Sequence, residues 1–114
     1  MTERRAKYRA IPERIDGYYF PSQAEARRYL FLMARLQAGE ISDLQVHPRF
    51  EIIAAAVIDG KRERAIYYEA DFQYREAGNI VVEDVKGYRT PVYRIKRRLF
   101  LQQYAGVVFR EVEA

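Results

Sequence analysis

Hydrophobic residues recur at helical spacing in two stretches of the chain. From Gln23 to Gln37 apolar side chains return every three or four residues, and Gly39 ends the pattern. The spacing returns between Thr90-Pro91, a capping hydroxyl followed by a proline suited to a first helical turn, and about Tyr104. Two helices are therefore predicted. The inward face of the second is expected to carry Val92, Ile95 and Leu99.

Between the two helices the pattern changes to the alternation typical of β-strands. The predicted strands, separated by turns at Asp59-Gly60 and at residues 76–79, cover Leu44–Ile58, Lys61–Arg75 and Ile80–Lys86. An Asp16-Gly17 hairpin precedes the first helix, and Val107–Val112 reads as a last strand. Because that strand follows a helical crossover, it is expected to run parallel to its predecessor. The prediction is an α/β fold: helix, three-stranded antiparallel meander, helix and strand, forming one mixed sheet flanked by helices.

Composition limits the classes of protein and of site. A chain of 114 residues suits one domain, predicted over residues 11–114 after a flexible basic arm at residues 1–10. No apolar run approaches the ~20 residues that cross a bilayer, and the N-terminus lacks the apolar stretch of a signal peptide, so cytoplasmic residence is expected. With no cysteine and one histidine, His47, to which no role is assigned, a metal would be held by oxygen ligands.

Charge is distributed unevenly along the chain. The net charge is only +4, but between Val85 and Arg110 no acidic residue occurs among seven basic ones. Such asymmetry is typical of a protein that binds a phosphate backbone, although a solvated basic helix face would give the same pattern.

The strongest candidate chemistry lies on the paired strands around residues 76–79. A turn centred between Ala77 and Gly78 sets Asp71 opposite Asp84, whereas a turn shifted by half a residue sets Asp71 opposite Lys86. In either register the two aspartates and the lysine share one face, because side chains alternate along a strand. Opposed carboxylates about 5 Å apart are destabilising unless something neutralises them, and a divalent cation would do so. A cross-strand salt-bridge cluster is the alternative, and it leaves Asp84 unexplained.

Asp71, followed after twelve residues by Asp84-Val85-Lys86, resembles the signature of the PD-(D/E)XK nuclease superfamily. Ala70 departs from the pattern, since a proline often stands there. Four segments look like a phage- and prophage-associated branch close to Holliday junction resolvases: Phe20-Pro21-Ser22-Gln23-Ala24-Glu25-Ala26, Gly39-Glu40-Ile41-Ser42-Asp43-Leu44, Ala70-Asp71-Phe72 and Val82-Glu83-Asp84-Val85-Lys86-Gly87.

This resemblance implies a restriction-endonuclease-like core and hydrolysis of DNA phosphodiester bonds. It implies Mg²⁺, with Mn²⁺ able to substitute, bound by Asp71, Asp84 and the backbone oxygen of Val85. Lys86 would orient or help deprotonate the attacking water. Glu25 would complete the site, although Ser22-Gln23-Ala24-Glu25 is also a capping box, in which the glutamate has no catalytic task.

The basic C-terminal third supplies the predicted DNA contacts. Phosphate contacts are expected from Arg89, Arg94, Lys96, Arg97 and Arg98. Tyr88 and Tyr93, flanked by arginines, are candidates for stacking on unpaired bases, whereas the other tyrosines fit a core. Glu83 faces away from the site and is expected to pair with a basic residue.

The leading hypothesis is a magnesium-dependent DNA endonuclease that selects a junction, branch or end, in phage-type recombination or DNA processing. A homodimer is expected by analogy, since two strands must be cut. The alternatives are a non-catalytic DNA-binding module and a structural phage protein.

Overall fold

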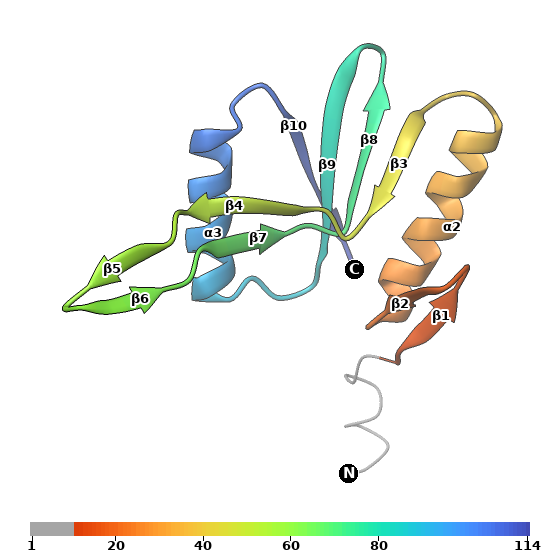
Figure 1. Cartoon of the computed structure of the whole chain (residues 1–114). Helices are drawn as coiled ribbons and strands as arrows, with labels where there is room; N and C mark the ends of the chain where they lie inside the picture. The colour runs from red at the N-terminus through yellow and green to blue at the C-terminus, as the bar shows by residue number, and fades with distance from the viewer. Residues whose placement is uncertain (1–10) are drawn as a thin grey trace, which may run out of the picture.

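The computed structural model describes residues 11–114 (Figure 1); the predicted N-terminal arm, residues 1–10, lies outside the described residues. The N-terminal half contains β1 (Glu13–Ile15), β2 (Tyr18–Phe20), α2 (Gln23–Gln37), β3 (Ser42–Val46), β4 (Arg49–Ile53) and β5 (Ala56–Ile58). The remainder contains β6 (Lys61–Glu63), β7 (Ile66–Glu69), β8 (Phe72–Glu76), β9 (Asn79–Lys86), α3 (Pro91–Gln103) and β10 (Val108–Glu113).

The predicted α/β fold with one mixed sheet, and with it the restriction-endonuclease-like core, is wrong. Strands predominate over helices, and the described residues form four separate sheets. One has four strands in the order β10-β9-β8-β3, and the others are the two-stranded pairs β1-β2, β4-β7 and β5-β6. The two long predicted strands each break into three pieces, so β4 to β7 leave the four-stranded sheet as a projecting hairpin, residues 49–69 (Figure 1).

The break has a local cause at the pair His47-Pro48. His47 adopts a positive φ of 56°, which turns the chain, and Pro48 has no amide hydrogen to continue a ladder. Two backbone hydrogen bonds fix the bend across the two strands, from His47 N to Asp71 O and from Ala70 N to Pro48 O, at 2.9 and 3.0 Å. The bend therefore occurs in both strands at once, beside Asp71.

The helices and the hairpin next to the candidate site agree with their predictions. Both helices begin after the expected caps: Ser22 Oγ accepts from the Glu25 amide, and Thr90 Oγ1 accepts from the Tyr93 amide. β8 and β9 pair in the first of the two registers considered, with Phe72 opposite Glu83. β10 runs parallel to β9.

Two apolar clusters pack against opposite faces of β9. One joins Val81 and Val85 to α2, and the other joins Val82 to α3, β4 and β7. The predicted inward face of α3 is confirmed for Leu99, which packs against the second cluster, and is wrong for Val92 and Ile95, which are each 61% exposed. Tyr93 and Phe100 are buried in their place, since their rings, also at helical spacing, fill the space against β4 and β7. Neither α2 nor α3, the helices of the described residues, is long and apolar enough to cross a membrane.

Candidate functional site

Asp71 lies between β7 and β8, one residue before the ladder with β9 begins. Its amide donates to the carbonyl oxygen of Glu83 at 3.0 Å, and its carbonyl oxygen accepts from His47. Its Oδ2 accepts from the amide of Val85 at 2.6 Å, across the sheet. The bend that ends the regular ladder thus directs the Asp71 carboxylate toward β9.

Asp84 is buried in the middle of β9, with 1% of its surface exposed. The Tyr68 hydroxyl donates to its Oδ2. Its Oδ1 forms an ion pair with Nζ of Lys86 at 3.1 Å and has no other polar partner among the described residues. The Lys86 ammonium also lies 4.4 Å from the centre of the Tyr93 ring. The structure therefore brings Asp71, Asp84 and Lys86 together, as the strand pattern predicted.

Glu25 projects from the first turn of α2 toward Asp71. The N-cap of α2 is formed by the backbone amide of Glu25, which donates to Ser22 Oγ. The Ser22 hydroxyl in turn donates to Oε2 of the Glu25 carboxylate at 3.2 Å. No hydrogen bond of the described residues joins the Glu25 carboxylate to the Ser22 amide, so the reciprocal half of a capping box is missing. The Glu25 carboxylate is available to the site.

His47 is the member that sequence reasoning missed. Glu25, His47 and Asp71 each offer one ligand atom, and these three atoms lie within 4.8 Å of one another. No motif marks His47 in the sequence. Its place follows from the pairing of β3 with β8 and from the bend at residues 47–48, which depends on a positive φ that alternation cannot reveal.

Burial and mutual repulsion raise the pKa values of the carboxyl groups. Burial, followed by the charge of Glu25, raises the pKa of Asp71 to about 7, against the opposing effect of the Val85 amide. Burial, followed by the charge of Asp71, raises the pKa of Asp84 to about 6, although Tyr68 and Lys86 act in the other direction. Burial also raises the pKa of Glu25. The negative charge of the cluster is thus only partly neutralised by the protein.

The donor set fits a hard divalent cation. The carboxyl groups of Glu25 and Asp71 and the imidazole of His47 converge within 4.8 Å, and Asp84 lies beside Asp71 with its Oδ1 paired only with the Lys86 ammonium. Carboxylate oxygens are ligands that suit such an ion. Val85 contacts the site through its amide, and the predicted role of its carbonyl oxygen stays a prediction.

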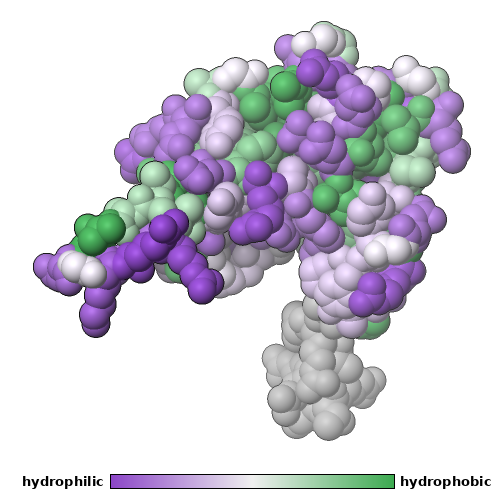
Figure 2. All heavy atoms as spheres, in the orientation of Figure 1, coloured by the Kyte–Doolittle hydropathy of each residue, from purple (hydrophilic) through white to green (hydrophobic). Residues whose placement is uncertain are grey.

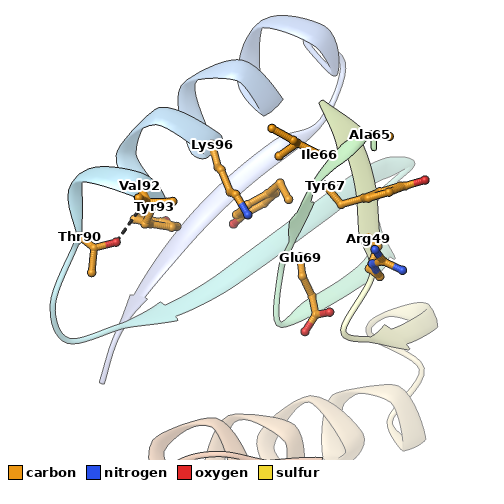
Figure 3. A pocket seen from close by; sticks show the side chains of 10 residues that line it. Arg49, Ala65, Ile66, Tyr67, Glu69, Thr90, Val92, Tyr93 and Lys96 are labelled. Carbon is orange, nitrogen blue, oxygen red and sulfur yellow. Dashed lines mark hydrogen bonds between the residues drawn. The ribbon is translucent and has the colours of Figure 1, made fainter. Parts of the chain in front are cut away.

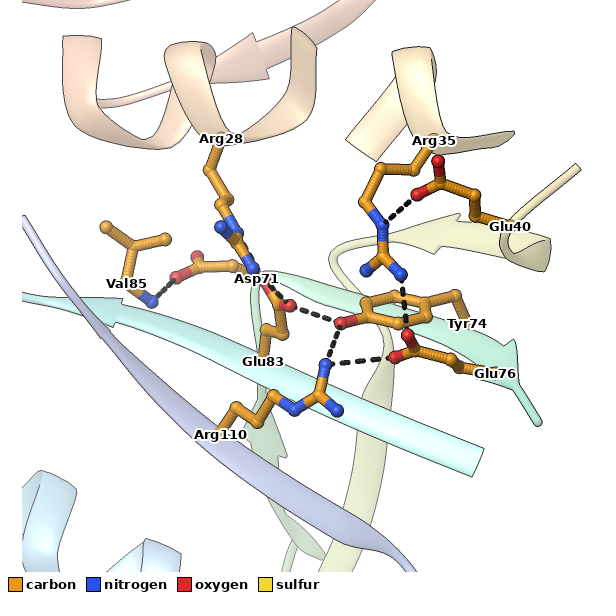
Figure 4. A network of polar contacts seen from close by, with 9 residues as sticks. All are labelled: Arg28, Arg35, Glu40, Asp71, Tyr74, Glu76, Glu83, Val85 and Arg110. Atoms are coloured by element: carbon orange, nitrogen blue, oxygen red, sulfur yellow. Dashed lines mark hydrogen bonds and ion pairs between the residues drawn. The ribbon is translucent and has the colours of Figure 1, made fainter. Parts of the chain in front are cut away.

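Glu83 is not a member of the site. Its two carboxylate oxygens each accept from Arg28 of α2 at 2.7 Å, and one accepts from the Tyr74 hydroxyl as well (Figure 4). Arg110 and Glu76 extend this network along the opposite face of β9. The expected pairing of Glu83 with a basic residue is confirmed.

The predicted DNA-contacting residues divide into two groups. Arg89 and Arg97 form ion pairs with Glu111 of β10 and are only partly available. Tyr93 is 8% exposed, and its hydroxyl donates to Glu111 at 2.6 Å, so its predicted stacking on bases is wrong: its ring is part of the core. The second group joins no ion pair within residues 11–114 and has accessible side chains: Tyr88, Arg94, Lys96 and Arg98.

Fold and site together define a small α+β protein with a centre of buried and half-buried carboxylates beside a lysine. The chain belongs to the family described as "Protein of unknown function (DUF1064)", whose model matches residues 5–113. No curated protein matches the sequence.

Proposed function

We propose that the protein is a magnesium-dependent DNA endonuclease that hydrolyses phosphodiester bonds. The observation that carries the proposal is the meeting of two aspartates with Lys86: Asp84 is buried, Asp71 is half-buried, and Oδ1 of Asp84 is paired only with the Lys86 ammonium. A salt bridge between Asp84 and Lys86 does not account for the third carboxylate, Glu25, placed against Asp71.

Each side chain of the site has a distinct role in the proposal. Asp71, Asp84 and Glu25, with the carbonyl oxygen of Val85, would hold Mg²⁺ or Mn²⁺, which when bound supplies stabilisation of negative charge on the reacting phosphate oxygens. His47 is placed to add a fourth side-chain donor. These ligands fix where the scissile phosphate can lie.

Lys86 is the general-acid-base candidate of the site. Its ammonium is held between Oδ1 of Asp84 and the Tyr93 ring, which orients it toward the carboxylates. From this position Lys86 can orient a water molecule for attack on the phosphate and exchange a proton with that water. Tyr68 fixes the orientation of Asp84 by donating to its other oxygen.

DNA contacts come from the accessible residues at the start of α3 and along it. Tyr88, Arg94, Lys96 and Arg98 would bind phosphates and bases with little sequence discrimination. Selectivity would then come from a junction, branch or end in the DNA. A homodimer in the cytoplasm of a bacterial or phage-infected cell, acting in phage-type recombination or DNA processing, is the setting that fits this activity.

The decisive experiment is a cleavage panel of plasmid, single-stranded and four-way-junction DNA, with Mg²⁺ or with chelator. Wild type is expected to cleave at least one substrate only with the ion, and Asp84→Asn and Lys86→Ala to bind DNA without cleaving it. The matched controls are Asp43→Asn, at an exposed aspartate of β3, and Lys61→Ala, at the exposed start of β6, and both should retain activity.

Other outcomes point to the two alternative functions. Binding of DNA without any metal-dependent cleavage by wild type would favour a non-catalytic module, and absence of binding would favour a structural phage protein. Persistent cleavage by Asp84→Asn would refute the proposed site.

A further inference from the structure

A cleft of about 600 Å³ lies between the N-terminal half of α3 and the projecting hairpin (Figure 3). One wall is formed by α3, and the other by β7 with Arg49 of β4. Its size falls within the range of pockets that bind small molecules, ~300 to 1,000 Å³. The side chains that give it chemical character are Arg49, Ile66, Glu69, Thr90, Val92 and Lys96.

The cleft adjoins the carboxylate centre through two tyrosines. Tyr68 and Tyr93 line the cleft, and each also contacts the site: Tyr68 donates to Asp84, and the Tyr93 ring packs against the ammonium of Lys86. A group bound in the cleft is therefore separated from Asp84 and Lys86 by a single layer of side chains.

The lining combines apolar walls with unpaired cations. Ile66 and Val92 line the two sides of the cleft and are exposed to solvent. Lys96 and Arg49 form no ion pair within the part of the chain that the structure describes. Exposed aliphatic surface suits the flat face of a base, and two cations suit a phosphate. Glu69 offers an acceptor for the amino groups on a base edge.

We infer that this cleft binds one unpaired nucleotide of the strand that is cut, next to the scissile phosphate. The inference rests on the proposed nuclease function and narrows its substrate to DNA with a base out of the stack. A base inside a duplex is stacked and paired, so it must first be extruded before it can enter the cleft, at a cost that an unpaired base does not incur. Flaps, bulges and single-stranded tails should therefore be cut faster than continuous duplex.

The first test needs no catalysis. Deoxynucleoside 5′-monophosphates are titrated into the ¹⁵N-labelled protein in chelator, beside the free nucleosides and inorganic phosphate. The monophosphates are expected to shift the amide resonances of Ile66, Val92 and Lys96. Val92→Trp, which fills the cleft, should abolish the shifts. Ile95→Trp is the matched control, because Ile95 is equally exposed, at 61%, but lies outside the cleft.

The second test compares cleavage of a duplex carrying an unpaired bulge with that of its fully paired counterpart. Wild type is expected to cut the bulged substrate roughly tenfold faster or more, the scale of one base-stacking contact. Val92→Trp should lose this preference and Ile95→Trp should keep it.

The outcomes separate this inference from the nuclease proposal. Equal cleavage of paired and bulged DNA, with no difference between the two tryptophan variants, overturns the nucleotide site and leaves the nuclease intact. Shifts that inorganic phosphate reproduces in full overturn the base-binding role. Nucleotide shifts at the cleft, with no metal-dependent cleavage of any DNA, support the nucleotide site and overturn the nuclease.

Discussion

At the scale of single residues, the half-buried Asp71 and the buried Asp84 destabilise the folded protein when they are charged. Their carboxyl groups have raised pKa values in the fold, about 7 for Asp71 and about 6 for Asp84, whereas an unfolded aspartate titrates near 3.8. Between the pKa of an unfolded aspartate and the raised pKa values of Asp71 and Asp84, the folded state therefore binds more protons than the unfolded state. Stability of the metal-free protein must fall as the pH rises from about 4 through 7.

Asp84→Asn should consequently stabilise the metal-free protein at pH 8. Asparagine removes the charge and keeps an oxygen to accept from Tyr68, so the free energy of unfolding should rise by on the order of 2 kcal/mol. The gain should disappear near pH 4, where wild-type Asp84 is itself neutral. Urea denaturation in chelator at pH 4, 6 and 8 measures this, with Asp43→Asn as control. A variant less stable than wild type at pH 8 would contradict the interpretation of Asp84 as a repelled, buried charge.

Glu25 is tested by the effect of magnesium on thermal stability. An ion that binds only the folded state of a protein raises the melting temperature of that protein. Millimolar Mg²⁺ should therefore raise the melting temperature of wild type by several degrees at pH 8. Glu25→Gln should lose most of this rise while its melting temperature in chelator stays close to that of wild type, because the Ser22 cap uses the backbone amide of residue 25. Differential scanning fluorimetry with and without the ion is sufficient. A large loss of stability in chelator would show that Glu25 is a structural residue.

At the scale of elements, the Arg28–Glu83 pair joins α2 to β9. Glu83 is fully buried, and both of its oxygens depend on Arg28. Arg28→Ala leaves this carboxylate with the Tyr74 hydroxyl alone and should cost about 3 to 5 kcal/mol of stability, as expected when a buried pair loses one partner. Arg27→Ala, an exposed neighbour on α2, should cost little. Urea denaturation measures the free energy of unfolding of both variants. Equal losses for the two substitutions would mean that the Arg28–Glu83 pair does not hold α2 to the sheet.

The elements also show how far the sequence alone could go. Helix ends and the β8–β9 register follow from local chemistry, namely caps, periodicity and a tight turn with positive φ at Ala77 and Gly78, and they placed Asp71, Asp84 and Lys86 together. The strand breaks depend on the paired bend at His47 and Asp71, which only long-range hydrogen bonds create. For this reason the prediction of a single sheet was wrong, and His47 was not recognised as a member of the site.

At the scale of the whole molecule, the tip of the projecting hairpin, residues 53–64, stands apart from the two apolar clusters. Every residue from 53 to 64 is exposed, including Val57 and Ile58 near the turn. Figure 2 shows this part extending from the body, with hydrophilic side chains beside apolar ones. A two-stranded hairpin without a packed face is marginally stable in water. The molecule therefore combines a packed body, which holds the carboxylate centre, with an extension that contributes little to folding.

This division predicts that the hairpin tip opens independently of the body. Backbone amides of β5 and β6 should exchange with solvent much faster than those of β8 and β9, because opening the tip exposes almost no apolar surface that the fold had buried. Replacing residues 55–64 by a short glycine-rich turn should shift the melting temperature by no more than about 2 °C, since a loss below ~0.5 kcal/mol is expected for exposed residues. Hydrogen exchange followed by mass spectrometry and a thermal melt provide the two measurements. Protection of β5 and β6 equal to that of β9 would mean that another surface covers the tip in solution, and the shortened variant would then lose stability in proportion to the area so covered.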